Sequence, residues 1–261
     1  MYSKNRGNFH RYFYLAVVFL CFLPFWPLLR YWSRDPNRYF SKFVWVRRIL
    51  SRTSSFLTGY HFQIEYQEPI DWSKTYVICP NHTSNLDIPG TILACKQDFA
   101  FVGKHELLNN PVTGIFFRTI DIPVNRKSNI SGYKALKRAA DYITKSKSVL
   151  IFPEGGIGNL YPPRLGEFKV GSFRLAVENN IPVIPVVIHN AWDLHWDNGT
   201  PHGSRPGTVY IDVLSPVQPR AVIDKASQEE ECGRLATLIY QQMADRLEKG
   251  CNKMDLGGSK Q

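Results

Sequence analysis

The sequence predicts an α/β fold, in which a layered domain with a largely parallel central sheet flanked by helices follows N-terminal membrane-associated helices. Short apolar runs alternate with helix-like segments from about residue 58 onwards, an order typical of a parallel sheet with helices on its faces. A long apolar stretch with basic flanks precedes them. We therefore divide the 261 residues into N-terminal helices, residues 1–57, and a folded domain, residues 58–261.

The apolar stretch Tyr12–Leu29 contains 18 residues and no charge, close to the roughly 20 residues that a membrane-spanning helix needs. Pro24 and Pro27 lie in its second half, where each removes a backbone donor and disfavours a straight helix. Basic residues flank both ends, whereas a spanning segment has its positive charge biased to one side. We expect a segment that enters one leaflet and returns. A segment that spans the whole membrane is the other possibility. A cleaved signal peptide is the alternative, but no small-residue cleavage site follows.

The next segment, Phe40–Leu57, has apolar residues at helical spacing beside the basic residues Lys42, Arg47, Arg48 and Arg52. This pattern is typical of a helix that lies in the interface on anionic lipid. A helix packed on the main domain is the alternative.

Charge and cysteine content narrow the possible partners and the compartment. Residues 1–50 carry nine basic groups against one acid and so hold +8 of the formal net charge of +10. Because these groups surround an apolar anchor, we expect a membrane lipid and no nucleic acid as partner. The five cysteines lack the close pairs of a zinc site or a disulfide framework. We therefore expect no metal and a location on the cytoplasmic face of the inner or an internal membrane.

Six apolar runs predict strands, several of them buried on both faces: residues 75–79, 99–102, 120–124, 149–152, 183–188 and 209–213. Helices are predicted at residues 88–95, 130–146, 170–179 and 228–249, and a disordered tail at 257–261. In parallel sheets, ligands meet the loops at the carboxyl ends of the strands. We therefore look for chemistry in those loops.

The first such loop, residues 80–87, places His82 five positions before Asp87. A neutral imidazole can take a proton from an attacking hydroxyl, and a carboxylate on its other nitrogen fixes the tautomer and stabilises the imidazolium. His82 would be the base and Asp87 its orienter. The alternative is structural, with Asp87 capping the following helix, and the spacing alone favours that alternative.

Two further loops carry candidate binding residues. Glu154, Gly155 and Gly156 follow the strand at 149–152, and such glycines let a backbone turn its N–H groups toward an anion. A plain glycine-rich turn is the alternative. Lys104 and Arg126 follow two other strands and are candidates for phosphate contact, although isolated basic residues are usually solvated.

In their order, these residues resemble the glycerolipid acyltransferase family that includes 1-acylglycerol-3-phosphate acyltransferase. The resemblance spans roughly residues 55–215. It rests on four blocks: NHTSNLD at 81–87, GKHELLNNPVTGIFFRTIDIPVNR at 103–126, FPEGG at 152–156 and IPVIPVVI at 181–188. It implies hydrophobic helices ahead of a catalytic domain, which agrees with residues 12–57.

The resemblance implies a function and assigns roles. The chain would move a fatty acyl group from acyl-CoA or acyl carrier protein, a co-substrate, to a lysophospholipid, with no cofactor. His82 and Asp87 would act as base and orienter, and Glu154 with its neighbours would shape the acceptor pocket. The family uses no metal and no covalent acyl-enzyme. Members acting on lysophosphatidic acid continue the third block as Glu-Gly-Thr-Arg, whereas this chain has Ile157 at the position of that arginine.

With isoleucine at position 157, the charge-assisted contact that the family's arginine makes near the phosphate is missing. The acceptor is therefore a lysolipid other than lysophosphatidic acid, or Lys104, Arg126 or Arg164 supplies the missing positive charge. Other functions remain as alternatives. One is a lipid-binding protein with this fold and no turnover, and another is a thioester hydrolase, although no Gly-x-Ser-x-Gly elbow is present. Head group, acyl-chain length, donor carrier and oligomeric state are open.

Overall fold

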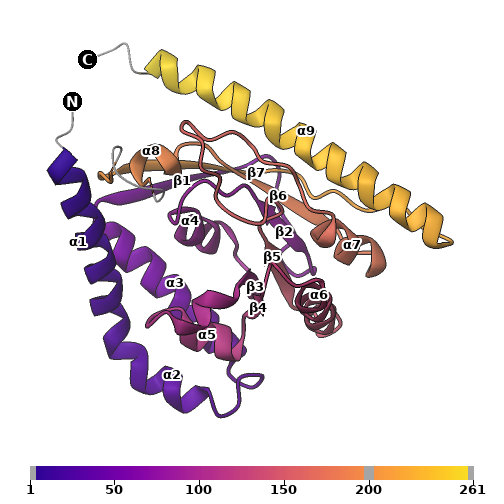
Figure 1. Cartoon of the computed structure of the whole chain (residues 1–261), viewed down its shortest axis with the longest axis horizontal. Helices are drawn as coiled ribbons and strands as arrows, with labels where there is room; N and C mark the ends of the chain where they lie inside the picture. The colour runs from indigo at the N-terminus through magenta and orange to yellow at the C-terminus, as the bar shows by residue number, and fades with distance from the viewer. Residues whose placement is uncertain (1–3, 197–202, 258–261) are drawn as a thin grey trace.

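A seven-stranded sheet forms the centre of the molecule (Figure 1). The computed structural model describes residues 4–196 and 203–257. The strands are β1 (Tyr60–Tyr66), β2 (Val77–Pro80), β3 (Phe99–Lys104), β4 (Ile122–Val124), β5 (Ser148–Ile151), β6 (Val183–Ile188) and β7 (Gly207–Val213). The longer helices are α1 (Lys4–Phe22), α3 (Phe40–Leu57), α6 (Asn129–Ile143) and α9 (Lys225–Gly257). Shorter ones are α2 (Trp26–Trp32), α4 (Asp87–Ala94), α5 (Gly114–Thr119), α7 (Gly171–Glu178) and α8 (Ala191–Leu194), with 3-10 turns η1 (Leu23–Phe25) and η2 (His105–Asn109).

The strand order is β1-β7-β6-β2-β5-β3-β4. All neighbouring strands are parallel except β6 and β7, which pair antiparallel. The predicted layered α/β fold with a largely parallel sheet is therefore confirmed, and each of the six predicted strands occurs within two or three residues of its expected place. Of the disordered tail predicted at 257–261, Gly257 is the last residue of α9, and residues 258–261 lie outside the described residues.

Alternate residues of the central strands contribute to two separate hydrophobic cores. Val77 and Cys79 of β2 belong to one core, whereas Ile78 belongs to the other, as expected because successive strand side chains point to opposite faces. The helices α6, α7 and α9 contribute to the first core and α4 to the second. Being covered on both sides, these strands read in the sequence as continuous apolar runs.

The edge strand β1 was not among the predicted strands. It pairs with β7 in register from Tyr60 opposite Gly207 to Tyr66 opposite Val213. Its even-numbered residues are the more buried ones, and alternate positions carry His61, Gln63 and Glu65 on the exposed side. The period-2 pattern in YHFQIEY is the signal that identifies such a half-covered strand.

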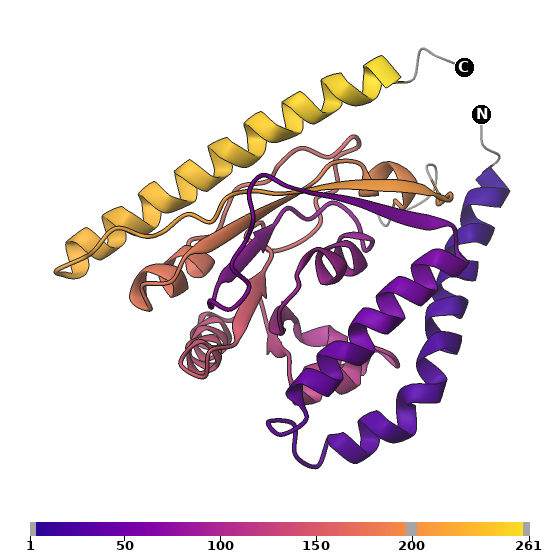
Figure 2. The same ribbon diagram turned by 180° about the vertical axis from the view of Figure 1, so that it is seen from behind.

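The apolar N-terminal stretch forms a bent helix. The turn η1 contains Pro24 and separates α1 from α2 (Figure 2), at the place where the prolines predicted an interruption. The most apolar 18-residue window of the stretch Phe9–Trp32 has a mean hydropathy of 2.0, and 17% of that window is buried in the protein. By length and composition this one helical stretch could cross a membrane. Large apolar side chains, among them Tyr12 and Leu20, are exposed along it.

The helix α3 packs on the α/β domain, the second of the two alternatives for this segment. Its apolar residues Phe43, Val44 and Val46 are fully buried, so this face is not available to lipid. Arg47 was expected among the cationic groups at the interface, but it lies inside the protein. It donates to Asp121 Oδ1 at 2.9 Å and to the carbonyl of Phe99 at 2.6 Å, because a buried guanidinium needs such partners.

Candidate active site

The loop between β2 and α4 holds the predicted catalytic pair. Asn81 fixes the start of this loop to β6, because its amide donates to the carbonyl of Ile188 at 2.9 Å and accepts from the Ile188 N–H at 2.7 Å. The next residue, His82, lies with its Nδ1 3.0 Å from Oδ2 of Asp87, the first residue of α4. The structure thus brings the two side chains together as the motif predicts.

Asp87 is fully buried and held by several donors. Its Oδ2 also accepts backbone N–H hydrogen bonds from Thr83 at 2.5 Å and from Ser84 at 2.8 Å. Burial raises the pKa of the Asp87 carboxyl, and the hydrogen bonds from His82 and the two N–H groups oppose this shift because they stabilise the ionised form. These bonds also fix the carboxylate in place, as an orienter requires.

His82 is presented in a defined orientation. Its ring stacks on Phe152, with the ring centroids 4.1 Å apart and the planes at 24°, and 12% of its side chain is exposed. With Nδ1 donating to Asp87, Nε2 is the nitrogen that can accept a proton. Within the described residues no hydrogen bond involves this atom, so it is available to a substrate hydroxyl.

Glu154 connects the loop that holds His82 with the loop that follows β5. Its Oε1 accepts from the backbone N–H of His82 and its Oε2 from that of Gly166, both at 2.7 Å. Burial raises its pKa, opposed by these two hydrogen bonds. Both carboxylate oxygens are thus used within the protein, so Glu154 shapes the site by holding two loops together.

Two cations lie against the glycines that follow Glu154. Gly155 has a φ of +73°, and a Cβ there would be 2.9 Å from Nζ of Lys169, while a Cβ on Gly156 would be 3.0 Å from Nη1 of Arg126. The backbone of Lys169 donates to the carbonyl of Pro153 at 2.9 Å, which ties this residue to the same loop. Because the two glycines have no side chains, the cationic groups of Lys169 and Arg126 can lie close to this part of the backbone.

The order of the strands explains how these residues meet. The strands β2, β5, β3 and β4 are consecutive neighbours in the sheet and parallel. Their carboxyl ends therefore present, at one edge, His82, Glu154, Lys104 and Arg126. Lys104 is the last residue of β3, opposite Val124 in register, and is exposed. It lies at the expected edge of the sheet but, unlike Arg126, has no described contact with the glycine loop.

Lys169 was not predicted as a site residue. Lys104, Arg126 and Arg164 are the substitutes predicted from the sequence for the cation that is missing at Ile157. The structure adds Lys169, which lies in a loop 14 positions beyond Gly155. The only available signal was the segment FKVG, residues 168–171, which resembles the family's continuation of the third block.

The neighbouring thiol and hydroxyl are poor nucleophiles. Burial raises the pKa of the Cys79 thiol to about 12, so the reactive thiolate is scarce at neutral pH. The hydroxyl of Ser84 is buried and donates to the carbonyl of His195 at 2.6 Å. Among the described residues, no three His, Cys, Asp or Glu side chains gather as around a metal ion, and the absence of a metal from the reaction stays a prediction.

Known proteins with similar sequences and folds match this region. Residues 61–189 match the Acyltransferase family model. A chloroplastic 1-acyl-sn-glycerol-3-phosphate acyltransferase from Brassica napus is 32% identical over 58% of this chain and 44% of its own length. The mouse 1-acyl-sn-glycerol-3-phosphate acyltransferase alpha is 27% identical over 66% of this chain and 60% of its own. This chain thus spans about half the length of its plant relatives.

A solved structure shares the fold. The crystal structure of the 1-acyl-sn-glycerophosphate acyltransferase PlsC from Thermotoga maritima matches with a TM-score of 0.69 and 22% identity. The match covers 94% of this chain and 96% of that one. It therefore includes the N-terminal helices as well as the sheet.

Proposed function

Because this chain belongs to the glycerolipid acyltransferase family, we propose that it is a membrane-associated 1-acylglycerol-3-phosphate O-acyltransferase. It transfers a fatty acyl group from acyl-CoA or acyl carrier protein to the free hydroxyl of the lysolipid. One observation carries this proposal: Nδ1 of His82 lies 3.0 Å from the buried carboxylate of Asp87, which leaves Nε2 as a proton acceptor at the ligand edge of the sheet.

The proposed reaction needs no covalent enzyme intermediate. The acceptor hydroxyl attacks the thioester carbonyl while Nε2 of His82 takes its proton, and a tetrahedral oxyanion forms. Collapse of this intermediate breaks the carbon–sulfur bond, and the departing thiolate takes the proton back from the imidazolium. The negative charge of Asp87 stabilises that imidazolium. The stacking of Phe152 on the ring keeps Nε2 aimed at one position during both transfers.

Lys169 and Arg126 support a phosphate-bearing acceptor. Their cationic atoms lie against Gly155 and Gly156, immediately before Ile157, where related acyltransferases have arginine. We propose that these two side chains supply the charge that Ile157 lacks. A charge-assisted contact from each corresponds to about tenfold or more in affinity for the phosphate.

The N-terminal helices support membrane attachment. Phe9, Tyr12, Leu15 and Leu20 expose half or more of their accessible surface along α1, and contiguous apolar surface of this kind marks an interaction site in a protein. Because Tyr14, Val17 and Phe22 of the same segment are buried against the protein, α1 lies along the domain. We infer that it enters one leaflet, on the cytoplasmic face, and brings the site to the bilayer surface where the acceptor resides.

The test is acyl transfer from labelled acyl-CoA and acyl carrier protein to a panel of lysolipids in detergent micelles. A labelled diacyl product from 1-acylglycerol-3-phosphate that disappears in His82→Ala supports the proposal. A product only with a different lysolipid corrects the acceptor. Binding of lysolipid without product from either donor indicates the lipid-binding alternative, and thiol release without acylated lipid indicates a hydrolase.

Lys169→Met tests the phosphate contact in the same assay. We expect a KM for 1-acylglycerol-3-phosphate that rises about tenfold or more, with little change for a lysolipid that lacks a phosphate. Lys134→Met, on the exposed side of α6, is the matched control for the loss of one positive charge. Equal effects of Lys169→Met on both acceptors would contradict a phosphate contact.

A further inference from the structure

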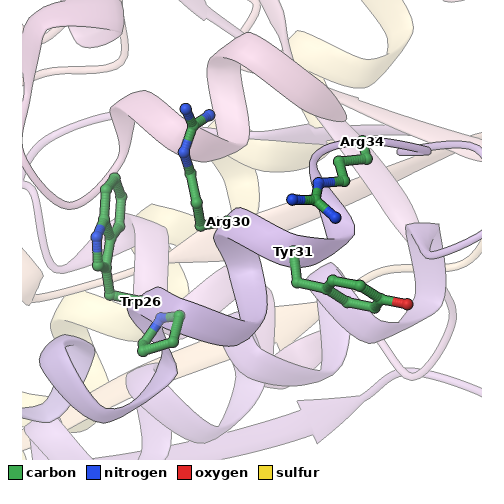
Figure 3. Close-up of a pocket in the computed structure, with 5 residues that line it drawn as sticks. Trp26, Arg30, Tyr31 and Arg34 are labelled. Carbon is green, nitrogen blue, oxygen red and sulfur yellow. The ribbon is translucent and has the colours of Figure 1, made fainter.

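A hollow on α2 lies at the end of the apolar N-terminal stretch. It has a volume of about 570 Å³ and is lined by Trp26, Pro27, Arg30, Tyr31 and Arg34 (Figure 3). This is within the range of roughly 300–1,000 Å³ typical of small-molecule sites. The catalytic residues lie elsewhere, at the carboxyl edge of the sheet, so this hollow is separate from the site described above.

The chemistry of the hollow is amphipathic and cationic. Trp26, Arg30 and Arg34 follow each other at intervals of four residues, which places them on one side of a helix and the turn that extends it. The guanidinium of Arg34 lies 5.7 Å from the ring centroid of Tyr31. Figure 3 shows the side chains of Trp26 and Arg30 extending from the same side of α2. A ligand with an anionic group next to apolar atoms fits such a surface.

The two arginines have no acidic partner among the described residues. Both are exposed, and no ion pair of either is present in the described parts of the chain. Asp35 is the only acid in residues 1–57, and its Oδ1 accepts the backbone N–H of Arg38. Two like charges one turn apart repel each other, so an anion bound between them would relieve this repulsion. Arginine is suited to phosphate because its planar fork can bind two oxygens.

The position of α2 determines which anion can reach the hollow. Leu29 and Trp32 of the same helix are buried at 0% and 8% exposure, so α2 is held on the protein by one side while the hollow faces outward. It directly follows the apolar segment that we propose to enter the bilayer. Tryptophan and tyrosine gather at the level of lipid head groups, and basic residues there are attracted to anionic lipids.

We propose that the α2 hollow binds the phosphate head group of an anionic phospholipid in the membrane surface. Trp26 and Pro27 would contact the glycerol and upper acyl region, and Arg30 and Arg34 the phosphate. The proposal rests on the membrane attachment inferred above but not on the acyltransfer activity. It gives the protein a preference for anionic membranes that the apolar helix alone does not provide.

The test measures binding of the full chain to vesicles of phosphatidylcholine alone and of phosphatidylcholine and phosphatidylglycerol in equal parts. The variant Arg30→Gln/Arg34→Gln should lose about 30-fold in affinity for the mixed vesicles, the loss expected for two basic residues at an anionic surface. Its affinity for phosphatidylcholine should stay unchanged. Lys134→Gln/Lys137→Gln on α6 removes the same charge from an exposed face and should leave both affinities nearly as in the native chain.

A third variant separates a built site from diffuse attraction. Arg30→Lys/Arg34→Lys keeps the charge and loses the two-oxygen geometry, so it should bind mixed vesicles more weakly than the native chain. Native-like binding of this variant, or an equal loss in the α6 control, would overturn the proposal. Displacement of the native chain from mixed vesicles by millimolar soluble glycerol 3-phosphate would also overturn the proposal, because it would indicate a site for a free anion. Weaker binding of Arg30→Gln/Arg34→Gln to phosphatidylcholine vesicles would overturn it as well.

Failure of the proposed function is distinguishable from failure of this inference. If the native chain binds neither kind of vesicle, membrane attachment itself is wrong. If it binds both equally, attachment stands and the head-group site is refuted. Acyl transfer in detergent micelles, measured for the same variants, reports separately on the catalytic pair and confirms that each variant is folded.

Discussion

The substitution Asp87→Asn probes the proposed catalytic pair, His82 and Asp87, with the smallest change in shape. In the native chain, Oδ2 of Asp87 accepts from His82 Nδ1 and from the N–H groups of Thr83 and Ser84, while Oδ1 has no protein partner among the described residues. An asparagine can keep all three hydrogen bonds if its oxygen takes the place of Oδ2. Its NH₂ group then occupies the place of Oδ1 and is buried without an acceptor.

Two effects of different size follow from this geometry. The buried NH₂ group should lower the free energy of unfolding by about 1–3 kcal/mol, which is a fall of a few degrees in Tm. The missing negative charge should lower kcat on the order of a thousandfold, within the range for general-base catalysis, because the imidazolium of His82 loses its stabilising partner. A thousandfold loss corresponds to about 4 kcal/mol of transition-state stabilisation. The KM for the acceptor should change little, since Asp87 is buried and does not contact it.

The assay is steady-state acyl transfer in micelles with a parallel urea unfolding curve. The second buried His–Asp pair of this chain provides a matched control, because Asp212 accepts from His189 at 2.7 Å and from Arg246 at 2.7 Å. Asp212→Asn should lower stability to a similar extent and leave kcat close to that of the native chain. The assignment of Asp87 as orienter is refuted if Asp87→Asn retains native kcat, or if Asp212→Asn loses as much activity as Asp87→Asn.

Further predictions concern the core, the glycine loop and acid stability. Arg47→Met should lower the free energy of unfolding by about 3–5 kcal/mol, because it leaves Asp121 as an unpaired buried charge. Urea unfolding measures this loss, and the double variant Arg47→Met/Asp121→Leu should recover part of it. Gly155→Ala, at a φ of +73°, should cost about 1–2 kcal/mol and raise the acceptor KM, whereas Gly158→Ala, where a Cβ meets nothing within 4 Å, should do neither. Burial acts to raise the pKa of Asp212, but its histidine and arginine partners lower it to about 2. The contribution of the Asp212 carboxylate to stability is therefore full above about pH 4 and is lost as the pH falls toward 2. Acid unfolding of Asp212→Asn should lack this pH dependence.

The parts of the site that were predicted from sequence are those with local signals. His82 and Asp87 lie within one loop, and both follow an apolar run whose length and composition identify a buried strand. Arg126 and Glu154 were placed correctly at the ends of strands because parallel strands bring their carboxyl ends to one edge. The role of Glu154 was not predictable, since it depends on Gly166 and on the backbone of His82, which only the fold brings within 2.7 Å.

Side chains that act over long sequence separations were missed. Lys169 reaches Gly155 from a loop without regular structure, and no periodicity indicates where such a loop folds back. Arg47 looked like a solvated cation on an amphipathic helix because its partner Asp121 is 74 residues away. A single charged residue on an apolar face is therefore ambiguous in sequence, since an exposed cation and a buried ion pair leave the same pattern.

The packing of α3 argues against residue 57 as the limit of a separable domain. Its side chains Phe43, Val44 and Val46 are completely buried in the same core as Ala100 and Val149 of the sheet. A chain beginning at residue 58 would therefore expose core side chains of the α/β domain and leave the buried Asp121 carboxylate without its arginine, at a cost of several kcal/mol. The proposed membrane-associated part is better limited to α1 and α2, which end at Trp32, before the turn that leads into α3. Loss of activity after a deletion through residue 57 would thus reflect lost stability, and only a deletion that ends before Phe40 can test the contribution of the anchor.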